Sequence, residues 1–130
     1  MESSVPGASQ GQRRVLVVDD YQDLADSLTL MLRALGADAR AVYDGEAALR
    51  SVEEFRPDLI LLDLGLPGLT GLDVARAISQ LPDLRQTRLI ALSGWSHDEA
   101  RMKSLQAGFD DFLVKPVAIE TLQRLLDAAV

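Results

Sequence analysis

The sequence predicts an α/β fold: a single, doubly wound parallel sheet of five strands with five helices. Short apolar runs alternate five times with amphipathic stretches from Arg13 onward, which is the pattern of repeated strand–helix units. The apolar runs show no polar alternation, and this is typical of strands that helices bury on both faces. Right-handed crossovers between such strands place helices on both sides of one sheet. A length of 130 residues suits one domain.

Each predicted strand is a short apolar run. The third run, Leu-Ile-Leu-Leu, is the clearest buried strand, and the second, Ala-Arg-Ala-Val, is the weakest candidate. The five runs span residues 15–18, 39–42, 59–62, 89–92 and 112–114.

The helices are predicted from apolar side chains at helical spacing. Gly36 and Gly108 are placed to end the first and fourth helices, Pro57 closes the second, and Ser96 can cap the start of the fourth. The apolar positions of the five helices lie within residues 24–35, 48–55, 74–78, 102–105 and 122–129.

Composition excludes several classes of protein. The chain has no cysteine, so it has no disulfide framework, thiolate zinc site or cysteine nucleophile. Lys and Arg number 13 against 20 Asp and Glu, a net charge of −7, which argues against nucleic-acid binding by this domain. No apolar run approaches the roughly 18 residues that span a bilayer. Residues 1–12 are small and polar without a signal-peptide pattern, so we expect a flexible leader, a domain over 13–130 and a cytoplasmic location.

Five polar residues mark the carboxyl ends of the predicted strands, where doubly wound folds place their sites. Three carboxylates close together repel one another unless a cation joins them, and a hard ion such as Mg²⁺ takes oxygen ligands of this kind. A carboxylate can also act as a nucleophile and form an aspartyl phosphate, while a lysine neutralises the phosphoryl charge and a serine donates to it. The five residues are Asp19, Asp20, Asp63, Ser93 and Lys115.

Taken singly, these residues have ordinary explanations, because aspartate at a strand end is often a turn former or a helix cap. Their conjunction is what indicates a site. His97 is the single histidine and is expected on the surface, so neither a zinc site nor a Ser–His–Asp triad is predicted. Gly65, Gly68 and Gly71 match no nucleotide-binding pattern and are interpreted as conformational freedom in the loop after Asp63.

The chain resembles the receiver domain of two-component response regulators over residues 13–129. Four segments carry the resemblance: 15–20 (Val-Leu-Val-Val-Asp-Asp), 61–71 (from Leu-Leu-Asp to Leu-Thr-Gly), 89–94 (Leu-Ile-Ala-Leu-Ser-Gly) and 112–116 (Phe-Leu-Val-Lys-Pro). The resemblance implies a flavodoxin-like sheet with strand order 2-1-3-4-5. It also implies a phosphorylatable signalling switch that is not an enzyme as an isolated domain, although it catalyses its own phosphorylation and dephosphorylation.

The resemblance assigns a role to each site residue. Asp63 matches the phosphoacceptor, and Asp19, Asp20, Asp63 and the Gly65 carbonyl match the ligands of Mg²⁺, for which Mn²⁺ could substitute. Ser93 and Lys115 match the residues that contact the phosphoryl group, and the Lys115–Pro116 bond is expected to be cis, as X–Pro bonds can be. Ser93 and Phe112 match the pair that switches conformation, with Phe112 lacking the hydroxyl that a tyrosine would bring.

The resemblance also implies partners. The expected phosphodonor is a histidine kinase or a histidine phosphotransfer protein, and the face of the fourth helix, fifth strand and fifth helix is the expected partner surface and a natural homodimer interface. The loop after Asp63 looks like that of receivers in hybrid sensor kinases, so the parent chain could be a hybrid histidine kinase or a stand-alone regulator. Gly65 and Trp95 occupy positions that modulate hydrolysis of the acyl phosphate in the family.

Two alternatives belong to other classes. Haloacid-dehalogenase-like phosphatases also use an aspartate nucleophile with Ser or Thr, Lys and Mg²⁺, but they need a second aspartate two residues after the nucleophile, where this chain has Gly65. The other alternative is an interaction module that signals through protein binding without phosphorylation.

Overall fold

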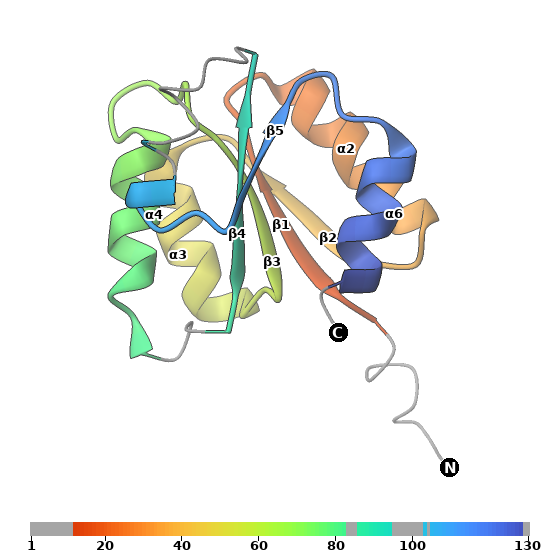
Figure 1. Ribbon diagram of the computed structural model, residues 1–130, viewed down its shortest axis with the longest axis horizontal. Helices are drawn as coiled ribbons and strands as arrows, with labels where there is room; N and C mark the ends of the chain where they lie inside the picture. The colour runs from red at the N-terminus through yellow and green to blue at the C-terminus, as the bar shows by residue number, and fades with distance from the viewer. Residues whose placement is uncertain (1–11, 83–85, 95–102, 104, 129–130) are drawn as a thin grey trace.

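The five strands form one parallel sheet in the order β2-β1-β3-β4-β5, which confirms the predicted topology (Figure 1). The computed structural model describes residues 12–82, 86–94, 103 and 105–128. The elements in chain order are β1 (Arg14–Val18), α2 (Gln22–Ala34), β2 (Asp38–Val42), α3 (Gly45–Phe55), β3 (Leu59–Asp63), α4 (Gly71–Ser79), β4 (Arg88–Ser93), β5 (Asp111–Val114) and α6 (Ile119–Ala128).

Helices cover both faces of the sheet, with α3 and α4 on one side and α2 and α6 on the other (Figure 1). Successive strand residues point to opposite faces, so Leu16 packs with the α3 and α4 side while Val15 and Val17 pack with the α2 and α6 side. All three are fully buried. This explains why the strands at the centre of the sheet are apolar without alternation.

Four helices lie in the part of the chain that the structure describes, against five expected. The remaining one, predicted from Ser96 onward, falls mostly outside the described residues, although Lys103, Leu105 and Gln106 are helical. Gly36 and Gly108 have positive φ of 99° and 109°, as expected for glycines that end helices.

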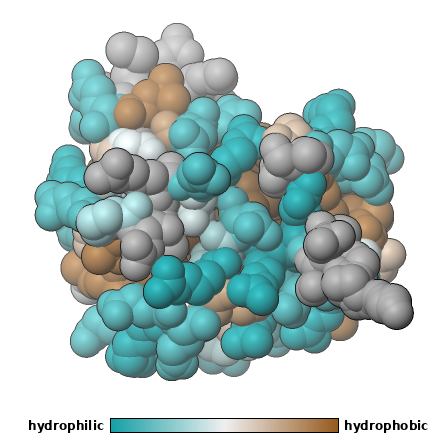
Figure 2. Space-filling view, turned by 90° about the horizontal axis from the view of Figure 1, so that it is seen from below, coloured by the Kyte–Doolittle hydropathy of each residue, from teal (hydrophilic) through white to brown (hydrophobic). Residues whose placement is uncertain are grey.

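The two ends of the sheet differ in character. The strands begin at the face shown in Figure 2, which is mostly hydrophilic, with apolar residues in small separate groups. The strands end at the opposite face, where the polar residues singled out by the sequence gather. Among the described residues, no helix combines the length and the apolar character needed to cross a bilayer.

Candidate functional site

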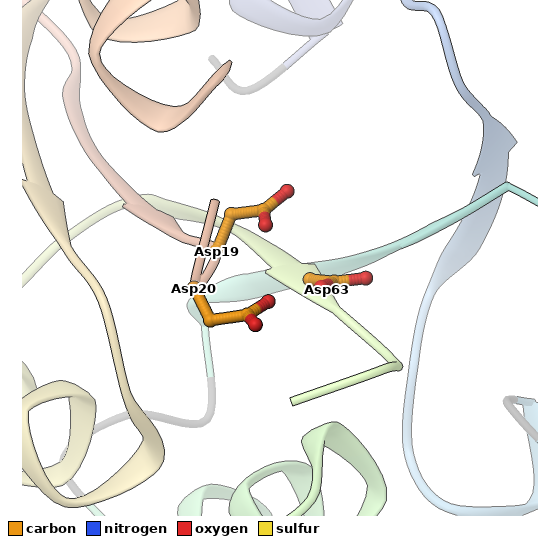
Figure 3. Close-up of side chains that lie close together, drawn as sticks. All are labelled: Asp19, Asp20 and Asp63. Atoms are coloured by element: carbon orange, nitrogen blue, oxygen red, sulfur yellow. The ribbon is translucent and has the colours of Figure 1, made fainter. Parts of the chain in front are cut away.

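Three carboxylates meet where β1 and β3 end. The two strands pair directly, with Val18 opposite Leu62, so the residues that follow, Asp19 and Asp63, are neighbours. Asp20 adds a third carboxylate, and one oxygen from each of the three lies within 4.8 Å of the others. Figure 3 shows the three side chains pointing into one space. Asp19 and Asp63 are buried, whereas Asp20 is exposed.

Lys115 is the cation that the fold brings to these acids. It follows β5, and its ammonium donates to the Oδ2 of Asp19 at 2.7 Å and lies 3.3 Å from the Oδ1 of Asp63. Its backbone N–H donates to the carbonyl of Ser93 at 2.7 Å, which ties the end of β5 to the end of β4. The Lys115–Pro116 peptide bond is cis, as the resemblance implies.

Backbone N–H groups also donate hydrogen bonds to the two buried carboxylates. The N–H of Gly65 donates to the Oδ1 of Asp63 at 3.2 Å, and the N–H of Tyr21 donates to the Oδ1 of Asp19 at 3.0 Å. Leu64 donates its N–H to the carbonyl of Leu92 at 3.0 Å, so the peptide after Asp63 is anchored on β4.

The electrostatics of the site follow from this burial. Burial raises the pKa of Asp63; the N–H of Gly65 opposes this, the charge of Asp19 adds to it, and Lys115 again opposes it, with a net rise above the ordinary value. Burial lowers the pKa of Lys115, but its hydrogen bond to Asp19 and the charge of Asp63 outweigh that effect, so the pKa is raised overall. Lys115 therefore stays charged, and Asp63 ionises only at a cost.

The residues present fit a divalent cation. Three carboxylates against one ammonium leave a local excess of negative charge, and Lys115 lies within ion-pair distance of two of the acids, Asp19 and Asp63. Carboxylate oxygens, one of them exposed, are the hard donors that Mg²⁺ and Mn²⁺ prefer.

Ser93 and Phe112 lie on the neighbouring strands β4 and β5. Ser93 is the last residue of β4 and is buried. Phe112 lies in β5 opposite Ala91, and its ring is buried in the core on the α3 and α4 side. The structure thus places both residues of the expected switch pair near the same end of the sheet, with the aromatic ring turned inward.

The interpretation of the three loop glycines is partly wrong. Only Gly68 has a positive φ, of 69°. A Cβ on Gly65 would meet nothing closer than the Asp63 carboxylate at 3.7 Å, and Gly71 is the first residue of α4. The sequence suggested a glycine chosen for backbone freedom. Gly71 is instead explained by close packing, because a Cβ there would lie 2.4 Å from the carbonyl oxygen of Asp63.

One element of the site was missed. Thr70 and Asp73 form a capping box at the start of α4, in which each side chain accepts a hydrogen bond from the other's backbone N–H. The signal was present in the sequence as a threonine followed three residues later by an acid. His97 and Trp95 lie outside the described residues.

Comparison with known proteins decides the family. The model of the family described as the response regulator receiver domain matches residues 15–127. The chain belongs to this family. The receiver domain is 41% identical over 108 residues to the DNA-binding response regulator MtrA of Mycolicibacterium paratuberculosis, covering 81% of this chain and 45% of that protein. The transcriptional regulatory protein PrrA of Mycobacterium bovis is also 41% identical, over 84% of this chain and 46% of its own length.

The receiver domain therefore spans about half the length of the curated relatives it matches. Solved structures agree with the fold. The chemotaxis response regulator CheY4 of Vibrio cholerae superposes with a TM-score of 0.84 at 26% identity, covering 92% of this chain and 99% of that one. The receiver domain of a sensor histidine kinase of Pseudomonas aeruginosa PAO1, solved with a magnesium ion in its active-site cleft, has a TM-score of 0.82 at 37% identity, covering 90% and 96%.

The protein is thus the receiver domain of a two-component system, and the matched family is not that of the haloacid-dehalogenase-like phosphatases. The family membership agrees with a signalling domain rather than a classical enzyme.

Proposed function

We propose that this receiver domain accepts a phosphoryl group on Asp63 from a phosphohistidine donor. The observation that carries the proposal is the buried Asp63 carboxylate, held between Lys115, Asp19 and the N–H of Gly65 at the strand ends. A carboxylate oxygen of Asp63 attacks phosphorus, the P–N bond of the donor breaks, and the imidazole nitrogen keeps the electron pair. Lys115 lies close enough to balance charge on the transferred group.

We propose Asp19, Asp20, Asp63 and the Gly65 carbonyl as the ligands of a divalent ion, Mg²⁺ with Mn²⁺ as a substitute. When bound, the ion supplies positive charge to offset that of the phosphoryl oxygens. Support comes from the three converging carboxylates and from the magnesium in the cleft of the Pseudomonas aeruginosa relative. We further propose that the Ser93 hydroxyl and Phe112 carry the switch, because both lie at this end of the sheet.

The test is intact mass after incubation with Mg²⁺ and acetyl phosphate, a small donor that needs no partner protein. We expect the chain to gain the mass of one phosphoryl group. Asp63→Asn should gain none, while Asp23→Asn, which removes an exposed acid from the first turn of α2, should gain as much as the wild type. A wild type that gains no mass, or an Asp63→Asn variant that gains it equally, contradicts the proposal and favours the interaction module that works without phosphorylation.

We propose two partner surfaces. Tyr21, which directly follows Asp20, and Leu30, further along α2, are large apolar side chains with exposed fractions of 63% and 64%, which suits the docking of a histidine kinase or phosphotransfer protein along this helix. The proposed phosphodonor is a kinase that draws on ATP, so we place this receiver domain in the cytoplasm. Leu105, Val114 and Ile119 are likewise exposed, on the face expected to hold a homodimer.

Two parents suit this domain. The identity to MtrA and PrrA supports a regulator with a separate output domain, and the identity to the receiver of a sensor histidine kinase supports a hybrid kinase. In either parent, we propose that contacts with nucleic acid or membrane are made outside this acidic domain, whose net charge is −7.

A further inference from the structure

The first residue of α4 rests directly on the backbone of Asp63. A Cβ built on Gly71 would lie 2.4 Å from the carbonyl oxygen of Asp63 and 2.9 Å from the Cα of Leu64. Both atoms belong to the main chain, so no side chain could turn aside to make room. The φ of Gly71 is not positive, so glycine is required here for space and not for backbone conformation.

This contact lies across the Asp63–Leu64 peptide from a hydrogen bond to β4. On the opposite side, the N–H of Leu64 donates to the carbonyl of Leu92 at 3.0 Å. The start of α4 is itself fixed by its capping box, because the Oγ1 of Thr70 accepts from the N–H of Asp73 at 3.2 Å. The peptide after Asp63 is therefore held between the end of β4 and the first turn of α4.

We infer that Gly71 is a positioning residue for phosphoryl transfer to Asp63. Its missing side chain lets α4 press against the acceptor backbone, and this contact sets where the Asp63 carboxylate lies relative to Lys115 and Asp19. Any side chain at position 71 moves the Asp63–Leu64 peptide away from α4, and the carboxylate moves with it. The inference rests on the proposed function, since it concerns the same reaction.

The chain offers a matched control in α3. Gly45 is also the first residue of a helix with a side-chain cap, from Asp44, and a Cβ there would lie 2.8 Å from the carbonyl oxygen of Leu69. The crowding is similar and also involves the Cγ2 of Val74 in α4, at 2.9 Å, but none of the three nearest atoms belongs to the Asp63–Leu64 peptide. Gly45→Ala therefore introduces a comparable clash without touching the acceptor peptide.

The experiment follows the rate of phosphorylation by acetyl phosphate in the presence of Mg²⁺, with intact mass as the readout. The Asp63 oxygen forms the new P–O bond, the P–O bond to acetate breaks, and acetate leaves with the electron pair. For Gly71→Ala we expect the maximal rate constant to fall roughly ten- to a hundredfold, as for an Å-scale misplacement of a reacting group, with an unchanged half-saturating donor concentration. Gly45→Ala should keep the wild-type rate constant.

A purely structural role predicts a different result. A partly unfolded variant in rapid folding equilibrium lowers the observed rate constant only by the factor of its folded fraction, which circular dichroism measures, so the rate constant of the folded molecules is unchanged after this correction. Equal rate constants for Gly71→Ala and the wild type, or equal losses in Gly71→Ala and Gly45→Ala, would overturn the inference.

If Gly71→Ala does not fold, two variants that each remove a helix cap test the inference instead. Thr70→Val removes the cap of α4 and Asp44→Ala that of α3, and only Thr70→Val should slow phosphorylation; equal rates would overturn the inference. A wild type that gains no phosphoryl mass overturns the proposed function, and the inference with it.

Discussion

Asp63 carries a charge that its surroundings compensate only in part. Its carboxylate is buried, it shares Lys115 with Asp19, and its pKa is raised above the ordinary value of 3.8 because burial outweighs the help of the Gly65 N–H and Lys115. An acceptor that is costly to ionise in the absence of a cation is one that gains from a cation or a phosphoryl group. The same burial that raises the pKa of Asp63 should therefore weaken the fold where the carboxylate is ionised.

Replacing Asp63 by asparagine should stabilise the metal-free protein. A raised folded-state pKa means that the folded chain holds this proton to higher pH than the unfolded chain does, so stability falls as pH rises from 3.8 through the raised pKa. In EDTA at pH 7 we expect Asp63→Asn to melt at a higher temperature than the wild type, because the variant buries no charge at this position. The difference should shrink as pH falls through that window. A variant that melts below the wild type at pH 7 would contradict the expectation.

The helices and strands show how far pattern alone reaches. All five strands lie where apolar runs predict them, but β3 extends to Asp63, which still pairs with Leu92 of β4, because backbone pairing is indifferent to side-chain polarity. The second helix, whose apolar positions begin at Ala48 in the sequence, starts at Gly45. Glycine has no apolar side chain to extend the helical spacing and is a poor helix former. Neither signal therefore shows that a helix begins at Gly45.

The site divides in the same way. Topology places the residues after parallel strands at one edge, so Asp63 and Lys115 could be grouped from sequence. Their distances could not be, since the 2.7 Å bond from Lys115 to Asp19 joins residues far apart in the chain. Likewise the contact of Gly71 with the Asp63 carbonyl depends on the packing of a helix against a loop, which leaves no periodic signal.

Two leucines of α2 lie on different faces of the helix, one buried and one exposed. Leu32 is fully buried, whereas the exposed fraction of Leu30 is 64%. We expect Leu32→Ala to lower the free energy of unfolding by about 2–5 kcal/mol, through lost transfer energy and a cavity, and Leu30→Ala to change it by less than about 0.5 kcal/mol. Urea unfolding measures both. A similar loss in the two variants would mean that α2 packs differently from the structure.

At the scale of the whole molecule, the acidic site exists only when the chain is folded. Asp19 and Asp20 follow β1 and Asp63 ends β3, so their convergence within 4.8 Å depends on strands that are distant in sequence. The unfolded chain has no such cluster, and a ligand of the cluster must therefore act on global stability. The surplus acid of the chain is thus a local source of binding energy as well as a solubility charge.

Magnesium should accordingly raise the stability of the entire domain. At a hundredfold excess over its Kd, a ligand that binds only the folded state adds about 2.7 kcal/mol, so the melting temperature should rise as MgCl₂ is titrated at constant ionic strength. Asp20→Asn should lose most of this rise, because it removes one of the three converging carboxylates from an exposed position where the core is undisturbed. Asp23→Asn removes the same charge from the exposed first turn of α2 and should keep the rise. If both variants respond to Mg²⁺ as the wild type does, the ion acts through general screening, and the three carboxylates do not form its site.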